Sequence, residues 1–355
     1  MNIDTPVLDP PTLARLHDCD AAVTQAAAAE FCAANARAYP GDCGPAACRG
    51  DFALMFDLLH AVLEFGFLQP LVEGLLWFSA MLAARGVERA RVTAAMEQLA
   101  AGLAARLPAH AAGIVTAAMR KALLRANQAQ AAEVPAWAGE TGGVPEALAF
   151  EQALLAGDRA AARQILLAVL RRATLPEAER RLIQPALYRI GLRWQRNEVS
   201  VADEHLATVI VQSLMTEALL EAPLARSNGR RAVLACVDGN HHGIGLQMVA
   251  DALQIAGWSV QCLGPNLPTP ALLDHVAAHP ADLLGLSLCF PQQLVHVREI
   301  MRGLPLSARP CVILGGLAVR QRDALVSDFG VDGVCADALE AVALAERLVG
   351  ARRPA

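Results

Sequence analysis

The sequence predicts an α and α/β protein with an all-helical N-terminal domain, a four-helix domain and a C-terminal doubly wound sheet of five parallel strands. Three observations lead to this prediction. The chain has 355 residues, which is too long for one ordinary domain. Its first two thirds are Ala-rich and helical in period, with aromatic residues at only 4% of the chain. From Arg231 onward, short β-rich runs alternate with helical ones.

The first domain is predicted over residues 1–140. Apolar residues recur at helical spacing over 52–67, 71–82 and 92–107, after a turn-forming stretch that begins at Tyr39. The stretch from Glu133 to Pro145 is rich in Gly, Pro and Thr, which indicates a linker.

The second domain, over residues 146–225, is predicted as four helices. Their expected ranges are 147–155, 159–172, 177–194 and 201–221. Ser200 and Asp203 have the spacing of a capping box, in which each side chain accepts a free backbone N–H group at the start of the last helix. A second linker follows at 225–229.

The third domain, over residues 229–350, alternates strands with helices. Strands are predicted at 232–237, 258–263, 283–289, 311–314 and 333–336. Helices are predicted at 246–256, 270–278, 294–304, 320–329 and 339–349. Such a chain forms a Rossmann-like sheet, here expected in the flavodoxin-like strand order, and its ligand lies at the carboxyl ends of the strands.

Composition excludes several function classes. The net charge of −5 gives no electrostatic footprint for DNA or RNA, so direct nucleic-acid binding is not predicted. The N-terminus has no signal-peptide pattern, and no run of apolar residues is long enough to span a membrane, so a cytoplasmic protein is expected. Five of the nine cysteines fall in the predicted strands and are interpreted as reduced core residues: Cys236, Cys262, Cys289, Cys311 and Cys335.

The loop after the first predicted strand holds two histidines, His241 and His242. Its glycines do not form a dinucleotide-binding or Walker pattern, and Cys289 stands where a phosphoacceptor receiver would have an Asp. Two interpretations remain open on the residues alone. The histidines are solvated loop residues, or His242 binds a transition metal while Asn240 accepts a hydrogen bond from its ring N–H.

The segment Asn240-x-His242-x-x-Gly245 resembles the Asp-x-His-x-x-Gly signature of cobalamin-binding domains, with Asn in place of the acid. Ser287-x-Cys289 resembles the Ser-x-Leu/Thr element that follows the third strand in that family. The family's pair of glycines has its counterpart at 315–316, and a four-helix cap precedes the domain, so the resemblance covers residues 146–350.

This resemblance implies a role for each matching residue. His242 becomes the lower axial ligand of cobalt in place of the nucleotide base, and Asn240 the partner that orients it. Ser287 contacts the displaced base. Gly315 and Gly316 let the nucleotide tail enter the sheet, since a buried tail needs close approach of the backbone.

The segment from Trp194 to Glu204-His205 resembles the cap of the cobalamin-dependent photoreceptor regulators. The resemblance implies that Trp194 packs over the upper ligand and that Glu204 and His205 hold a 5′-deoxyadenosyl group. Those regulators carry a His directly after the Trp, whereas this chain has Gln195. On the residues alone, the segment also fits a core Trp beside an exposed Glu–His ion pair.

The function expected from these resemblances is an adenosylcobalamin-binding light sensor without catalysis of its own. It is expected to form homo-oligomers and to act through an unidentified effector or regulator protein. The alternative is a corrinoid methyl carrier of a methyltransferase system, which needs an open upper face. A subunit of a cobalamin-dependent isomerase is a third hypothesis, because it shares the adenosyl cofactor.

The N-terminal domain is loosely similar to the globin-like domain of photoreceptors that pair cobalamin with a bilin such as biliverdin. His60, Cys43 and Cys48 are the candidate residues for that second chromophore. The alternatives are structural histidines, ordinary thiols, and a helical bundle for dimerisation or partner docking.

Overall fold

A computed structural model describes residues 5–40, 44–129, 145–305, 309–319 and 328–352. Most of the predicted linker at 133–145 and of the predicted helix at 320–329 lies outside these residues. The chain divides into two compact units. The first comprises residues 1–136 and 192–199, and the second comprises residues 137–191 and 200–355.

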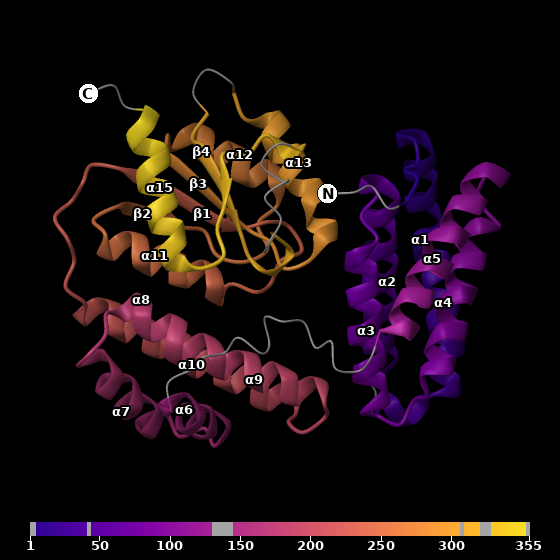
Figure 1. The fold of residues 1–355 in the computed structure, drawn as a ribbon, viewed down its shortest axis with the longest axis horizontal. Coiled ribbons are helices and arrows are strands. Elements are labelled where there is room, and N and C mark those ends of the chain that lie inside the picture. The colour runs from indigo at the N-terminus through magenta and orange to yellow at the C-terminus, as the bar shows by residue number, and fades with distance from the viewer. Residues whose placement is uncertain (1–4, 41–43, 130–144, 306–308, 320–327, 353–355) are drawn as a thin grey trace. The chain divides into compact units, whose positions relative to one another are not determined.

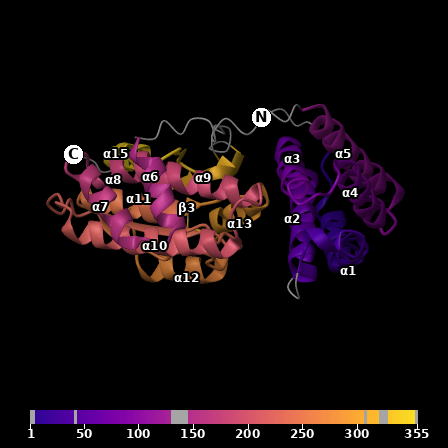
Figure 2. The ribbon, with the colours of Figure 1, turned by 90° about the horizontal axis from the view of Figure 1, so that it is seen from below.

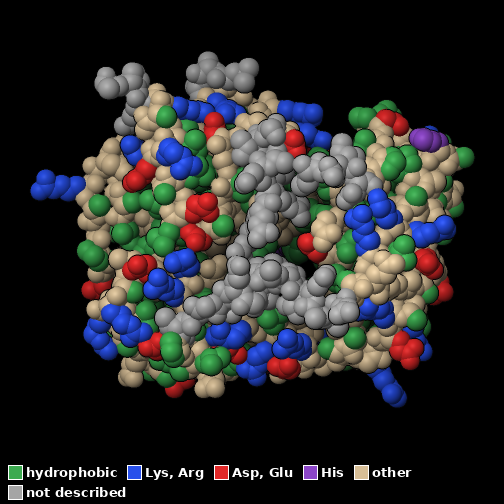
Figure 3. Space-filling model, viewed as in Figure 1, with side chains coloured by type: hydrophobic (Ala, Val, Ile, Leu, Met, Phe, Trp, Pro, Cys, Tyr) green, Lys and Arg blue, Asp and Glu red, His purple; other side chains and the backbone are tan. Residues whose placement is uncertain are grey.

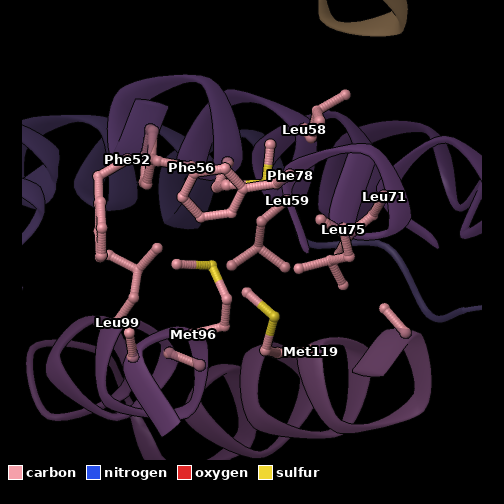
Figure 4. Packing of buried hydrophobic residues seen from close by; sticks show 14 of the residues in the cluster. Phe52, Phe56, Leu58, Leu59, Leu71, Leu75, Phe78, Met96, Leu99 and Met119 are labelled. Atoms are coloured by element: carbon pink, nitrogen blue, oxygen red, sulfur yellow. The ribbon is translucent and has the colours of Figure 1, made fainter. Parts of the chain in front are cut away.

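The first unit contains α1 (Pro10–Ala34), α2 (Gly44–Phe65), α3 (Gln69–Ala83), α4 (Arg89–Ala104) and α5 (Ala109–Gln128). Asp9 begins α1, because its carboxylate accepts the N–H of Thr12 at 3.0 Å. Large apolar side chains from α2 to α5 fill the centre of the bundle, among them Phe52, Phe78 and Met96 (Figure 4). The structure therefore confirms the expected all-helical region.

A disulfide between Cys32 and Cys48 joins α1 to α2. Cys48 is therefore not one of the ordinary thiols that the sequence also allowed, because the packing of the two helices brings its side chain to that of Cys32. The predicted strand cysteines are free thiols, including the buried Cys236, Cys311 and Cys335.

The helices after the linker are α6 (Glu146–Leu155), α7 (Arg159–Leu170), α8 (Leu175–Ala178), a π-helical turn (Glu179–Ile183), α9 (Gln184–Gln195) and α10 (Val201–Glu221). They belong to the second unit except for the last turn of α9, from Leu192, which belongs to the first. The single helix predicted at 177–194 is therefore interrupted by a π turn. The predicted capping box is confirmed: Ser200 Oγ accepts the N–H of Asp203 at 3.1 Å, and Asp203 Oδ2 accepts the N–H of Ser200 at 2.9 Å.

The sheet consists of β1 (Arg231–Cys236), β2 (Ser259–Cys262), β3 (Leu283–Ser287), β4 (Cys311–Gly315) and β5 (Gly333–Val334). All the strand pairs are parallel, and the order is β2-β1-β3-β4-β5. This confirms the doubly wound sheet and its flavodoxin-like order. β1 and β3 lie inside the sheet and are apolar almost throughout, as expected for strands covered on both faces.

The helices of this domain are α11 (Ile244–Ile255), α12 (Thr269–Ala278), α13 (Leu294–Gly303) and α15 (Ala338–Arg352). α11 has two apolar faces. Leu246 and Leu253 pack into the core of the sheet, whereas Met248 and Ala252 pack into the core of helices α6 to α10. Figures 1 and 2 both show helices α6 to α10 gathered on one side of the sheet domain, so α11 lies between these helices and the strands.

The exposed surface has mixed charge. On the face drawn in Figure 3, basic and acidic side chains are interspersed, in keeping with the small net charge of −5. Among the residues that the structure describes, no helix is both long and apolar enough to cross a membrane.

Candidate functional site

The loops at the carboxyl ends of β1 and β2 are hydrogen-bonded to each other. The main-chain N–H of Asn266 donates to Asn240 O at 2.9 Å, and the N–H of Gly239 donates to Asn266 Oδ1 at 2.9 Å. Gly239 and Asn266 adopt positive φ angles of 73° and 55°, which Gly and Asn tolerate best. This contact fixes the backbone of the loop that carries His242.

Asn240 is fully buried and joins this loop to β3. Its Nδ2 donates to Ser287 O at 2.8 Å, and its Oδ1 accepts the main-chain N–H of His242 at 3.1 Å. The structure joins Asn240 to the backbone of His242, and the bond from Asn240 to the His242 ring stays a prediction. The geometry also accounts for the amide, because a carboxylate cannot donate to the carbonyl oxygen of Ser287.

The imidazole of His242 is accessible to solvent and has protein groups close to it. The residue is exposed by surface area, yet burial by surrounding protein atoms lowers its pKa, while Glu204 acts in the opposite direction and His241 adds to the decrease. The ring meets Phe290 edge-on, with a centroid distance of 5.9 Å. The lowered pKa favours the neutral imidazole that metals require.

Glu204 and His205 lie in the first turn of α10. His205 Nδ1 is 2.7 Å from Glu204 Oε2, and Thr208 Oγ1 donates to Glu204 Oε1 at 3.1 Å. The side chain of Glu204 is 34% exposed and that of His205 is 73% exposed. Because the charge of Glu204 raises the pKa of His242, this carboxylate belongs to the surroundings of the histidine loop.

Trp194 belongs to the first compact unit. Its ring stacks on Trp77 at a centroid distance of 5.9 Å, and the Arg85 guanidinium lies 5.7 Å from the ring centroid. The neighbouring Gln195 donates from Nε2 to Trp77 O at 3.3 Å, and its own carbonyl accepts from Arg85 Nη1 at 3.2 Å. The end of α9 is therefore joined to Trp77 and Arg85 through both Trp194 and Gln195.

The three glycines of the predicted motif differ in whether the surrounding protein would tolerate a side chain. Gly316 has a φ of 101°, and a Cβ there would lie 2.1 Å from Leu288 O, so the backbone of the protein itself demands Gly. A Cβ on Gly315 would lie 3.5 Å from Cys335 Sγ, an ordinary contact. A Cβ on Gly245 would meet nothing within 4 Å, so the space beside the histidine loop is open.

One further residue of the site, Gln293, was not foreseen. The buried Gln293 accepts, through Oε1, the N–H groups of Cys289 at 2.9 Å and Phe290 at 3.1 Å, and thereby shapes the loop after β3. Burial raises the pKa of the Cys289 thiol to about 11, so it stays protonated. The sequence signal for this role is the position of Gln293: it is polar, lies four residues after Cys289 and directly precedes the amphipathic helix α13.

The candidate residues for a second chromophore are not all available. Cys48 is buried and bonded to Cys32, so its thiol is not free in this structure, and Cys43 lies outside the described residues. His60 is partly buried, with Nδ1 3.8 Å from Glu64 Oε2 and its ring 6.4 Å from that of His17.

The residues around His242 fit a cobalt corrinoid better than a bare metal ion. Within the described ranges, no group of three or more His, Cys, Asp or Glu side chains converges on one point. A bare ion needs several protein ligands, whereas a corrin carries its own equatorial nitrogens and needs one axial imidazole. The open space at Gly245 and the accessible ring of His242 supply the room and the ligand.

Comparison with known proteins gives two matches to the B12 binding domain, at residues 148–218 and 230–345. The HTH-type transcriptional repressor CarH of Myxococcus xanthus is 30% identical over 233 residues, which are 62% of this chain and 75% of that protein. The repressor CarA of the same organism is 32% identical over 152 residues, 41% of this chain and 49% of CarA. Dimethylamine corrinoid protein 3 of Methanosarcina acetivorans is 31% identical over 137 residues, 37% of this chain and 63% of that protein.

Proposed function

The chain belongs to the B12-binding protein family, and from this premise we propose that it is an adenosylcobalamin-dependent light sensor that regulates a partner protein. Cobalamin is the cofactor of the family. The finer assignment, to the adenosyl form and to light, rests on the cap. The observation that carries it is the pair of Glu204 and His205 at the start of α10, where His205 Nδ1 lies 2.7 Å from Glu204 Oε2 and the carboxylate is an acceptor for ligand hydroxyls.

The proposed roles follow from the chemistry of the side chains. His242 binds the lower face of the cobalt, while Asn240 and Ser287 hold the loop that presents it. On the upper side, Glu204 accepts hydrogen bonds from ribose hydroxyls and His205 orients this carboxylate. Trp194 offers a flat partner for the adenosyl group.

Adenosylcobalamin supplies a cobalt–carbon bond that green light breaks. Glu204 and His205 would then lose the ligand that their positions favour. A conformation that was stabilised by this ligand is then less populated, which is how loss of a bound group becomes a change of cap position or oligomeric state. We propose a homo-oligomer that passes this change to an effector protein.

A corrinoid methyl carrier is the second candidate, and the similarity to the dimethylamine corrinoid protein favours it. The two functions place different demands on the upper side. A carrier needs an upper face open to partner enzymes, whereas a sensor needs polar groups for a bulky ligand. Glu204 and His205 at the start of α10 therefore favour the sensor.

A bilin in the N-terminal domain is a further part of the proposal, with His60 as the residue to test. Co-expression with a source of biliverdin should give a red-absorbing band that His60→Ala weakens. His110→Ala, in the same domain, serves as the matched control. A purified protein without such a band would reject the second chromophore and leave the cobalamin sensor intact.

The decisive experiment is reconstitution with adenosylcobalamin in the dark, followed by absorption spectra and size-exclusion chromatography before and after green light. The sensor predicts a stable adenosyl spectrum that converts to a cobalt(III) form on illumination, together with a change in elution volume. Methylcobalamin is the parallel sample. Preferential uptake of methylcobalamin, with no change in size after light, would favour the methyl carrier.

A further inference from the structure

Two carboxyl groups face each other where the helical part of the second unit packs on the sheet domain. Glu179 begins the π-helical turn, and Asp251 lies in the middle of α11. Both residues have a relative exposure of 0%. Burying an ionised carboxylate costs folding free energy unless a cation or a hydrogen-bond donor pairs with it, so the partners of these two groups decide their charge.

The donors near the pair do not satisfy it. Gln247 Nε2 donates to Asp251 Oδ1 at 2.5 Å. Both oxygens of Glu179, and Oδ2 of Asp251, are buried and make no hydrogen bond to another described group. Two ionised carboxylates are both acceptors and cannot bond to each other, but one proton between them creates a strong hydrogen bond.

The surrounding charges support a protonated pair. Burial is the largest effect on Glu179 and, with the nearby Asp251, raises its pKa to about 10. Burial likewise raises the pKa of Asp251, and the Cys262 thiol on β2 faces the same group. No cation of the described ranges is among the groups that shift either pKa, and two arginines of the same helical part are engaged elsewhere: Arg180 lies 3.7 Å from Asp337, and Arg189 pairs with Glu151.

We propose that Glu179 and Asp251 share a proton and that this proton latches the helical cap to α11. The latch joins the cap to the helix that begins two residues after His242, and it does so at a π turn, a distortion that is frequent at functional sites. Loss of the proton leaves two buried negative charges face to face and drives the cap away from α11. The latch acts in the chain without ligand, so it is independent of which group occupies the upper cobalt position.

The sign of the pH dependence follows from linkage. Because the folded-state pKa of Glu179 is raised above its ordinary value of 4.5, the folded chain holds a proton that the unfolded chain has already released at neutral pH. The stability is therefore complete below the ordinary pKa and is lost as the pH rises towards about 10. An amide in place of one carboxyl group keeps a donor at every pH.

The test is the Tm of the full chain without cofactor, measured between about pH 6 and pH 9, where the two states bind different numbers of protons. The Tm of the wild-type chain should fall as the pH rises, and Glu179→Gln should make this fall less steep. The Tm of the variant should therefore exceed that of the wild-type chain by more at higher pH. Glu151→Gln is the matched control, because Glu151 is also buried in the cap but pairs with Arg189. It should lower Tm without flattening the slope.

Hydrogen exchange supplies a structural readout at one alkaline pH. The π turn at 179–183 and α11 should exchange more slowly in Glu179→Gln than in the wild-type chain. Asp251→Asn tests the same latch from the other side. Parallel Tm curves for the wild-type chain and both variants would overturn the proposal, and if neither variant folds, a wild-type Tm that is constant across this pH range would overturn it.

Discussion

The histidine loop carries His242, and the start of α10 carries Glu204, which affects the pKa of the His242 imidazole. The two regions are held in place by different interactions. The loop is fixed by hydrogen bonds to the end of β3 and to the loop after β2, through the buried Asn240 and Ser287 and the exposed Asn266. Glu204 and His205, by contrast, lie on one exposed helical turn and bond mainly to each other and to Thr208. The lower ligand is therefore preorganised by the sheet, whereas the upper contacts are left for a ligand to complete.

This difference predicts two kinds of mutational effect. Changes in the loop disturb buried polar groups, so they lower both stability and the affinity for any cobalamin. Changes at the start of α10 leave the fold unaffected and alter only which upper ligand is preferred. The following variants break or sharpen this contrast, in order of decreasing expected effect.

His242→Ala should have the largest effect on cobalamin binding, because it removes the axial ligand itself. We expect the loss of affinity to exceed the roughly 10- to 100-fold that removal of an outer hydrogen-bond partner costs. Titration followed by absorption spectroscopy measures it and also reports the axial ligand. His241→Ala is the control, being an exposed neighbour. Equal affinities in the two variants would reject His242 as the ligand.

Gly316→Ala should destabilise the fold, because the positive φ alone costs about 1–3 kcal/mol and the new Cβ would collide with Leu288 O. Gly315→Ala is its matched partner, since its Cβ makes only an ordinary contact with Cys335. Urea unfolding measures the difference. If Gly315 lines the nucleotide tail, its variant should fold normally and bind cobalamin more weakly, and unchanged affinity would remove it from the site.

Asn240→Asp introduces the residue that the family motif carries, yet we expect it to be harmful here. The carboxylate would face Ser287 O without a proton to donate, which costs about 1–3 kcal/mol of stability. Asn240→Ala loses both bonds and should be at least as unstable. Denaturant unfolding at neutral pH checks both variants. An Asp variant as stable as the wild-type chain would show that the amide is not required.

The sequence predicted the sheet and its strand order because these depend on local patterns: apolar runs separated by turns and by helical stretches. It also singled out His242, Asn240 and Ser287, which the structure places together. The hydrogen bond from Asn240 to Ser287 could not be predicted from the sequence, because Ser287 is 47 residues away and the contact depends on the register of β1 and β3.

Packing between helices was the least predictable part. The π turn at Glu179 interrupts an apolar pattern that reads as one continuous helix, and the disulfide of Cys32 with Cys48 depends on how α1 meets α2. Neither has a local signal. In the N-terminal bundle most of the core is interchangeable apolar residues, so its sequence predicts helices without indicating what they bind.

Glu204→Gln should have the smallest effect on the protein alone. An exposed Glu–His pair contributes little to stability, so the free energy of unfolding without ligand should change by no more than about 0.5 kcal/mol, as for ordinary surface substitutions. The amide keeps the size of the side chain but weakens its acceptance of ribose hydroxyls. The ratio of affinities for adenosylcobalamin and hydroxocobalamin should therefore fall towards one. Glu198→Gln, an exposed Glu before α10, controls for loss of charge. A ratio unchanged in Glu204→Gln would place the adenosyl group elsewhere, and the contrast between a fixed lower side and a selective upper side would fail.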